Sequence, residues 1–173
     1  KDVEREEMEH FEEHLATVDA EKKKKESTDV TMDVEPTDAS IEELTDRNAE
    51  WRKELRSSMK AKERTAIERV KMPELDPAYR ATTRTEEVNI GLTKEMALTE
   101  AKRCLDCPKP TCMEGCPVSI NIPSFIKNIE RDQFLAVAKV LKNTSALPAV
   151  CGRVCPQEKQ CESKCVHLKM NEP

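Results

Sequence analysis

Eight cysteines are the residues of this 173-residue chain best suited to chemistry, and all of them lie in its second half. Four occur in CLDCPKPTCMEGCP, residues 104–117, with the pattern Cys-x2-Cys-x4-Cys-x3-Cys-Pro. Four more occur in CGRVCPQEKQCESKC, residues 151–165, with the pattern Cys-x3-Cys-Pro-x4-Cys-x3-Cys. The two groups differ only by small changes of length and form an internal two-fold repeat. Repeated thiols of this kind predict disulfides, zinc sites or iron–sulfur clusters.

Disulfides and zinc both fit the pattern poorly. Disulfides persist in oxidising compartments, whereas the start of the chain, KDVEREEMEH, is too charged for a secretory signal. Zinc sites favour cysteine pairs with two residues between them, and only Cys104 and Cys107 form such a pair. A structural zinc module used for protein–protein contact is therefore kept as the alternative function.

Iron–sulfur clusters fit the spacing better. The bacterial two-cluster pattern is Cys-x2-Cys-x2-Cys-x3-Cys-Pro, and its fourth cysteine binds the other cluster. The first group here differs from it only in the longer second gap. By symmetry, the ligands expected for the first cluster are Cys104, Cys107, Cys112 and Cys165. Those expected for the second cluster are Cys116, Cys155 and Cys161, with Cys151 offered by symmetry as the fourth.

The charge of the cysteine-bearing half supports clusters. Residues 101–173 carry 11 basic and 7 acidic side chains, although the whole chain has a formal net charge of −5. Thiolate-ligated clusters are anionic, and nearby cations offset that charge and raise the reduction potential. The candidate cations are Arg103, Lys109, Arg153 and Lys164. The acidic overall balance and an aromatic content of 3% argue against a nucleic-acid partner.

Residues 1–72 are expected to form a charged helical arm with a turn-rich linker near residues 27–40. Ser40 and Glu43 have the spacing of a capping box. They predict a helix that begins there and ends at about residue 71. Charge-patterned helices of this kind are typically solvated connectors, and docking to a partner or sister domain is the alternative.

Residues 73–173 are expected to form an all-α domain with long loops, because no convincing strand alternation occurs. Two prolines predict an extended segment over residues 73–92. Thr93 is placed to cap a short helix that leads to the first cysteine group. Pro123 suits the first residue of the next helix, and Asp132 suits the cap of the helix after it.

The three histidines are weaker candidates for metal ligands. His10 and His14 have the spacing of a helical metal pair, but no other ligand type stands at matching spacing, so surface positions are expected. His167 closely follows Cys165. We expect it to lie at the surface or beside the ligands rather than to be one.

The chain lacks the loops that bind nucleotides. It has only three glycines, in neither a Gly-x-Gly-x-x-Gly pattern nor a Walker loop. We therefore expect no flavin site, no NADP site and no catalytic site within it. No apolar run is long enough to cross a bilayer, and a cytoplasmic location is expected. Because the chain begins with Lys1, we expect it to be a fragment of a longer protein.

The segments EAKRCLDCPKPTCMEGCPVSINIPSFI and ALPAVCGRVCPQEKQCESKCV resemble the N-terminal iron–sulfur domain of the NADPH-dependent glutamate synthase small subunit. The same domain occurs in dihydropyrimidine dehydrogenase and in the large subunit of the electron-bifurcating NADH-dependent ferredoxin–NADP oxidoreductase. The resemblance covers roughly residues 73–173 and includes the prolines that follow Cys116 and Cys155. It implies an α-helical ferredoxin domain that transfers electrons through two [4Fe-4S] clusters.

The resemblance also has implications for the parent protein and for the ligands. It implies downstream FAD and NADP(H) domains, a partner oxidoreductase subunit or domain, and either NADPH-linked glutamate formation or ferredoxin-linked bifurcation. The family's ligands match the sets given above for Cys104, Cys107, Cys112 and Cys165 and for Cys116, Cys155 and Cys161. In relatives the last ligand of the second cluster is a Glu or Gln beyond the counterpart of Cys165. That implies a buried structural role for Cys151 and a chain that stops just short of the last ligand. The symmetry of the repeat instead makes Cys151 the ligand, and both alternatives stay open.

Overall fold

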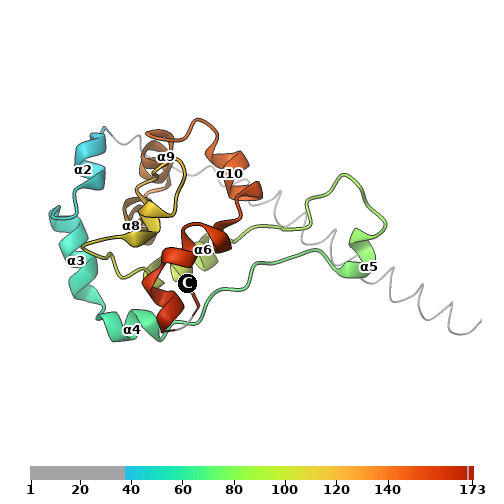
Figure 1. The fold of residues 1–173 in the computed structure, drawn as a ribbon, viewed down its shortest axis with the longest axis horizontal. Coiled ribbons are helices and arrows are strands. Elements are labelled where there is room, and N and C mark those ends of the chain that lie inside the picture. Colours follow the sequence, from blue (N-terminus) through green and yellow to red (C-terminus); the bar gives the residue numbers. More distant parts are fainter. Residues whose placement is uncertain (1–37, 171) are drawn as a thin grey trace, which may run out of the picture. The chain divides into compact units, whose positions relative to one another are not determined.

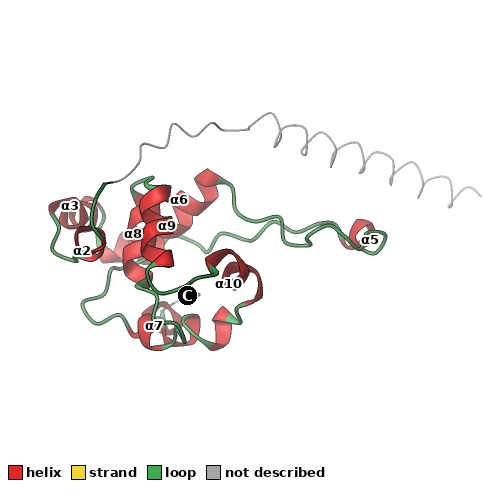
Figure 2. Cartoon of the chain, turned by 90° about the horizontal axis from the view of Figure 1, so that it is seen from above, coloured by secondary structure: helices red, strands yellow, loops and turns green. Residues whose placement is uncertain are grey.

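The computed structural model describes residues 38–170 and 172–173, which belong to a compact unit spanning residues 36–173. Residues 1–37 of the predicted arm lie outside the described residues, and they include most of the linker near 27–40 and both His10 and His14. The described part of the chain consists of helices joined by loops and contains no strand (Figure 2). The predicted all-α class is therefore confirmed.

Three short helices open the described chain. They are α2 (Ile41–Thr45), α3 (Glu50–Ser58) and α4 (Ala61–Thr65). The predicted capping box is confirmed, since the Ser40 amide donates to the Glu43 carboxylate at 2.7 Å and the Glu43 amide donates to the Ser40 hydroxyl at 3.2 Å. The prediction of one helix to residue 71 is wrong. The first break follows Asp46, whose carboxylate accepts from the Asn48 amide at 2.8 Å, because short polar side chains that bind nearby backbone favour turns over helix.

Residues 70–92 form an extended excursion with α5 (Pro77–Arg80) at its end (Figure 1). Its two arms are antiparallel neighbours: the Leu75 amide donates to the Val88 carbonyl at 2.8 Å, and the Ile90 amide donates to the Pro73 carbonyl at 2.9 Å. The predicted extended segment is thus confirmed apart from α5. That helix begins where Asp76 accepts from two backbone amides, a local cap that the prediction overlooked.

Four further helices carry the first cysteine group and the helical stretch after it. They are α6 (Lys94–Arg103), α7 (Thr111–Glu114), α8 (Ile122–Glu130) and α9 (Phe134–Lys142). The predicted Thr93 cap of α6 is confirmed. The predicted start of the next helix at Pro123 is one residue late, because α8 begins at Ile122 and Pro123 is its second residue. The predicted cap of α9 is wrong, because its N-cap is Gln133. Asp132 instead has a φ of +64° and pairs with Lys94 at 2.7 Å.

The second cysteine group follows in less regular structure. It occupies α10 (Pro148–Val154) and the 3₁₀ turns η1 (Gln157–Lys159), η2 (Glu162–Lys164) and η3 (Val166–Lys169). Short 3₁₀ turns change the direction of the chain every few residues. They can therefore present several side chains of one segment toward a single point, as a wrapped ligand loop requires.

The hydrophobic core joins α2, near the N-terminal end of the described residues, to α9. Leu44 of α2 is buried against Ala136 and Val140 of α9, and Phe125 of α8 packs beside them. Burying a leucine side chain contributes about 1.5–3 kcal/mol. The helices α2, α3 and α4 thus belong to the same compact unit as the cysteine-bearing helices, whereas the sequence predicted a division near residue 72.

Candidate metal centre

A cavity of about 340 Å³ lies between α6, α8 and the loops of both cysteine groups. The four thiols predicted for the first cluster, Cys104, Cys107, Cys112 and Cys165, all line it. Much of the remaining wall is apolar and includes Phe125, Ile126 and Ile129 of α8. The structure therefore brings together four thiols from both cysteine groups in one largely apolar enclosure.

The thiols at this cavity are close enough to influence one another's ionisation. Burial raises the pKa of Cys104 and of Cys107. It raises the pKa of Cys112 to about 12, with the charges of Cys104, Cys165 and Cys107 as further causes. Metal ligation requires the thiolate form, and a bound cation supplies the charge that stabilises it. Without a metal, burial therefore favours the neutral thiols of Cys104, Cys107 and Cys112, and bound cations would favour their thiolate forms.

The second predicted ligand set is less fully assembled around one point. Burial is the main cause that raises the pKa of Cys161, and the charge of Cys155 adds to it, so these two thiols are neighbours. Cys161 also lines the cavity described above. Cys116 and Cys151 do not line it. The Sγ atom of Cys116 accepts from the Ile120 amide at 3.5 Å, and that of Cys151 lies 3.9 Å from the Ser145 hydroxyl.

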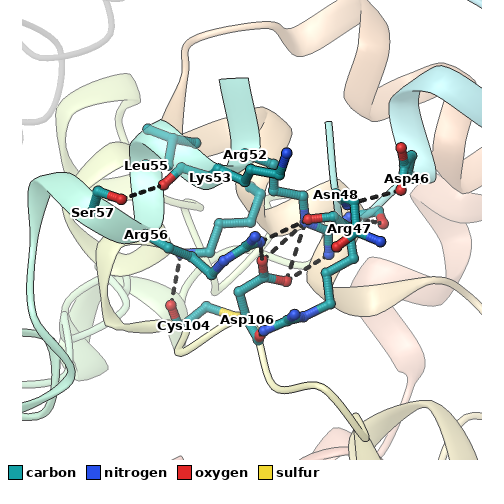
Figure 3. A network of polar contacts seen from close by, with 12 residues as sticks. Asp46, Arg47, Asn48, Arg52, Lys53, Leu55, Arg56, Ser57, Cys104 and Asp106 are labelled. Carbon is teal, nitrogen blue, oxygen red and sulfur yellow. Dashed lines mark hydrogen bonds and ion pairs between the residues drawn. The ribbon is translucent and has the colours of Figure 1, made fainter. Parts of the chain in front are cut away.

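Arginines of α3 contact the loop between Cys104 and Cys107 (Figure 3). Asp106 in this loop is fully buried, and Arg52 of α3 contacts both of its carboxylate oxygens, at 2.6 and 3.1 Å. Arg56 adds a contact of 2.6 Å. Burial alone would raise the pKa of the Asp106 carboxyl, but the hydrogen bonds and charges of both arginines outweigh it and hold that pKa below its usual value. Asp106 is therefore a paired carboxylate inside the protein.

A second buried ionic network supports the backbone of Cys104. The Lys127 ammonium donates to the Cys104 carbonyl at 2.7 Å and pairs with Glu130 at 2.5 Å. Glu130 in turn pairs with Arg64 of α4 at 2.9 Å. The Lys127 side chain is fully buried. Burial raises the pKa of the Cys104 thiol, and the nearby charge of Lys127 acts against that effect.

Only one of the four basic residues predicted to lie near a cluster lines the cavity. Arg103 is buried and lines the cavity. Arg153 is exposed and paired with Glu87, and Lys109 and Lys164 are exposed. Lys127 and the arginines of α3 were missed. One available signal was the acidic residue between two candidate ligands in CLDC, matched by arginines four apart at 52 and 56.

His167 is buried beside this site, in agreement with a place next to the ligands rather than at the surface. Its Nε2 atom lies 2.9 Å from the Arg103 carbonyl oxygen. Because that oxygen can only accept, Nε2 carries the proton. Among the described residues, neither the His167 Nδ1 atom nor the Arg103 Nε–H has a hydrogen-bond partner. An unpartnered buried donor on a cavity-lining residue suits an acceptor brought in by a cofactor, such as a cluster sulfur.

No group of three or more His, Cys, Asp or Glu side chains among the described residues is placed to hold a metal ion by itself. The thiols instead stand around the cavity wall. None of the helices in the described ranges has the length and apolar character needed to cross a membrane.

Comparison with known proteins identifies the class of this cysteine arrangement. Residues 80–173 match the family described as dihydropyrimidine dehydrogenase domain II, 4Fe-4S cluster. The chain belongs to this family. The expected iron–sulfur domain is thereby confirmed, and the match begins after α4 and within the excursion.

Individual relatives agree with the family match. The chain is 35% identical over 96 residues to the glutamate synthase [NADPH] small chain of Azospirillum brasilense, covering 56% of this chain and 20% of the relative. It is 36% identical over 88 residues to the NAD-dependent dihydropyrimidine dehydrogenase subunit PreT of Escherichia coli strain K12, covering 51% of this chain and 21% of the relative. The chain thus spans about a fifth of the length of these relatives.

Proposed function

We propose that this chain is an electron-transfer module that carries two [4Fe-4S] clusters within an NAD(P)H-dependent oxidoreductase of the glutamate synthase small-chain type. The observation that carries the proposal is the convergence of four cysteines, drawn from both halves of the repeat, on one cavity inside the family-matched segment. A cluster spread over a cavity needs its ligands around the wall. The positions of the thiols support that arrangement.

The first cluster is assigned to the cavity. Its ligands in this proposal are Cys104, Cys107, Cys112 and Cys165. When bound there, a [4Fe-4S] cluster supplies one-electron redox chemistry that no side chain of the chain offers. The protein's own part is to hold the thiolates, to exclude water with the apolar wall of α8, and to offset negative charge with Arg103 and Lys127.

The second cluster is assigned to the other half of the repeat. Its ligands in this proposal are Cys116, Cys155 and Cys161. We assign its fourth ligand to a carboxylate or amide oxygen from outside the two cysteine groups, and we give Cys151 a structural role. The Cys151 Sγ atom lies 3.9 Å from the Ser145 hydroxyl, a contact within the protein that suits a structural thiol and supports that assignment.

The wider reaction is proposed from the relatives. The matched relatives include glutamate synthase small chains and dihydropyrimidine dehydrogenase subunits. We propose that electrons pass through this chain between a flavin- and NAD(P)H-binding part of the parent protein and an acceptor on a partner oxidoreductase subunit or domain. The chain contributes no catalytic site of its own. A reducing compartment such as the cytoplasm suits its eight free cysteines.

Metal and sulfide analysis tests this function. Protein purified without air should be brown, should bleach with dithionite, and should contain iron and acid-labile sulfide in equal amounts. We expect about four iron atoms per chain if only the first site fills and about eight if both fill. A colourless protein that contains zinc and no sulfide would refute the proposal and favour the structural zinc module.

A further inference from the structure

Three arginines near the N-terminal end of the described residues lie outside the family-matched segment but contact it. Arg47 follows α2, and Arg52 and Arg56 belong to α3. The family match begins at residue 80. All three arginines nevertheless reach into the matched segment and end on one residue, Asp106, between the candidate ligands Cys104 and Cys107.

Their contacts fix Asp106 from both ends. Arg52 grips the carboxylate with its Nε and Nη2 atoms, and Arg56 reaches the second carboxylate oxygen at 2.6 Å. Arg47 holds the backbone instead, since its Nε and Nη2 atoms donate to the Asp106 carbonyl at 3.1 and 2.9 Å. The remaining Nη1 of Arg52 donates to Ser124 of α8 at 2.8 Å. Arg52 therefore ties the ligand loop to the helix that forms the cavity wall.

The backbone conformation of Asp106 explains why these arginine contacts are needed. Its φ of +53° lies in the left-handed region, which a non-glycine residue occupies at a cost. A conformation of this kind persists where surrounding contacts determine it. In CLDC it turns the chain between two cysteines that must face the same cavity. The arginines supply the contacts that hold this turn.

We infer that Arg47, Arg52 and Arg56 are positioning residues for the first cluster, and that they set the Cys104–Cys107 turn through Asp106. The inference rests on the proposed function, because it needs a cluster at the cavity. It extends the metal centre to residues 47–56, which precede the family-matched segment. If α3 only stabilised the fold, its arginines would not need to contact the residue between two candidate ligands.

Geometry and charge can be separated by the choice of substitution. Arg52→Lys keeps the positive charge but loses the planar fork that contacts two oxygens at once. Arg52→Met loses both. Arg80→Met is the matched control, because Arg80 lies in α5 and makes only a partly exposed pair with Glu74 at 3.3 Å. Arg47→Met is the milder second variant, since Arg47 is only partly buried and binds backbone rather than the carboxylate.

The experiment measures the full chain, purified without air, by iron and sulfide content and by the electron paramagnetic resonance spectrum and midpoint potential of the reduced protein. We expect Arg52→Lys and Arg52→Met both to change the spectrum of one cluster and to lose iron, up to about half of the total if one of two sites empties. Arg47→Met should change the same spectrum more weakly. Arg80→Met should match the unmodified chain.

The outcomes distinguish this inference from the proposed function. If the unmodified chain holds no iron, the proposed function fails. If it holds iron and both Arg52 variants keep full iron with an unchanged spectrum and potential, the inference is overturned. Should the Arg52 variants fail to fold, the Arg47→Met spectrum decides, since an unchanged spectrum there also overturns it. A spectrum restored by Arg52→Lys alone would indicate charge without positioning and likewise contradict it.

Discussion

Gly115, which ends the short helix of the first cysteine group, packs directly against the backbone of Gln160 in the second. A Cβ atom on Gly115 would lie 2.5 Å from the Gln160 carbonyl oxygen and 3.0 Å from the Cα atom of Cys161. Both neighbours are backbone atoms and cannot turn aside as a flexible side chain would. The two halves of the repeat therefore meet at a point where only glycine fits, next to a cysteine that lines the cavity.

Gly115→Ala should push the two cysteine groups apart. Forcing a methyl group into a tight backbone contact typically costs about 1–3 kcal/mol. We expect the free energy of unfolding of the iron-free chain to fall by that amount in urea titrations, and the iron content of the purified chain to fall with it. Gly115 has no positive φ, so the effect would come from the contact and not from backbone strain.

Gly152→Ala is the matched control for that substitution. Gly152 lies inside α10, and a Cβ atom there would meet nothing within 4 Å. Alanine in a helix is favoured over glycine by about 0.5–1 kcal/mol, so this variant should be slightly more stable and keep its iron. Equal behaviour of the two variants would show that the contact between Gly115 and Gln160 does not limit assembly.

Leu44→Ala tests whether the front helices belong to the folded unit. Leu44 is 1% exposed and packs on Ala136 and Val140 of α9. Truncating a buried leucine costs about 2–5 kcal/mol, which urea unfolding followed by the emission of Trp51, the single tryptophan of the chain, should detect. Val154→Ala is the control, because Val154 is 71% exposed and surface changes usually stay within about 0.5 kcal/mol. An unaffected Leu44→Ala variant would mean that α2 is an appendage.

The features that could be predicted from the sequence are those decided within a few residues. Ser40 with Glu43, and Thr93, are caps whose hydrogen bonds close within three residues of the cap. The cysteine spacing is likewise a local signal, because cysteines a few residues apart on one loop can bind the same cluster. Such signals survive without knowledge of the fold.

The features that could not be predicted depend on contacts across the chain. Asp132 has the right type and position for a helix cap, but its ion pair with Lys94 and its left-handed backbone place it outside α9. Arg52 and Asp106 are 54 residues apart. No local pattern shows that an arginine in a charged stretch will be buried. The sequence therefore predicts a solvated arm over residues 1–72, although Arg47, Arg52 and Arg56 within it hold the ligand loop.

Glu130→Gln should strongly destabilise the chain. Glu130 is the shared partner of Lys127 and Arg64, whose side chains are at most 3% exposed. Removing one member of a buried ionic network leaves uncompensated charge and typically costs about 3–5 kcal/mol. Glu50→Gln provides the comparison, since Glu50 pairs with Lys53 on the surface and such pairs contribute about 0–1 kcal/mol. Similar urea midpoints for both variants would contradict the importance of the Glu130 network.

The role of Cys151 can be decided by alanine, which cannot replace a sulfur ligand. Cys151→Ala should keep the iron content and spectrum of the unmodified chain, because we give Cys151 a structural role with its thiol beside the Ser145 hydroxyl. Cys112→Ala should lose iron, since Cys112 lines the cavity, where burial and then the charges of three neighbouring thiols raise its pKa. Cys155→Ala is the comparison within the second half of the repeat. If Cys151→Ala loses as much iron as Cys155→Ala, the symmetry of the repeat is the better guide and Cys151 is the fourth ligand. If only Cys155→Ala loses iron, the fourth ligand of the second cluster comes from outside the two cysteine groups.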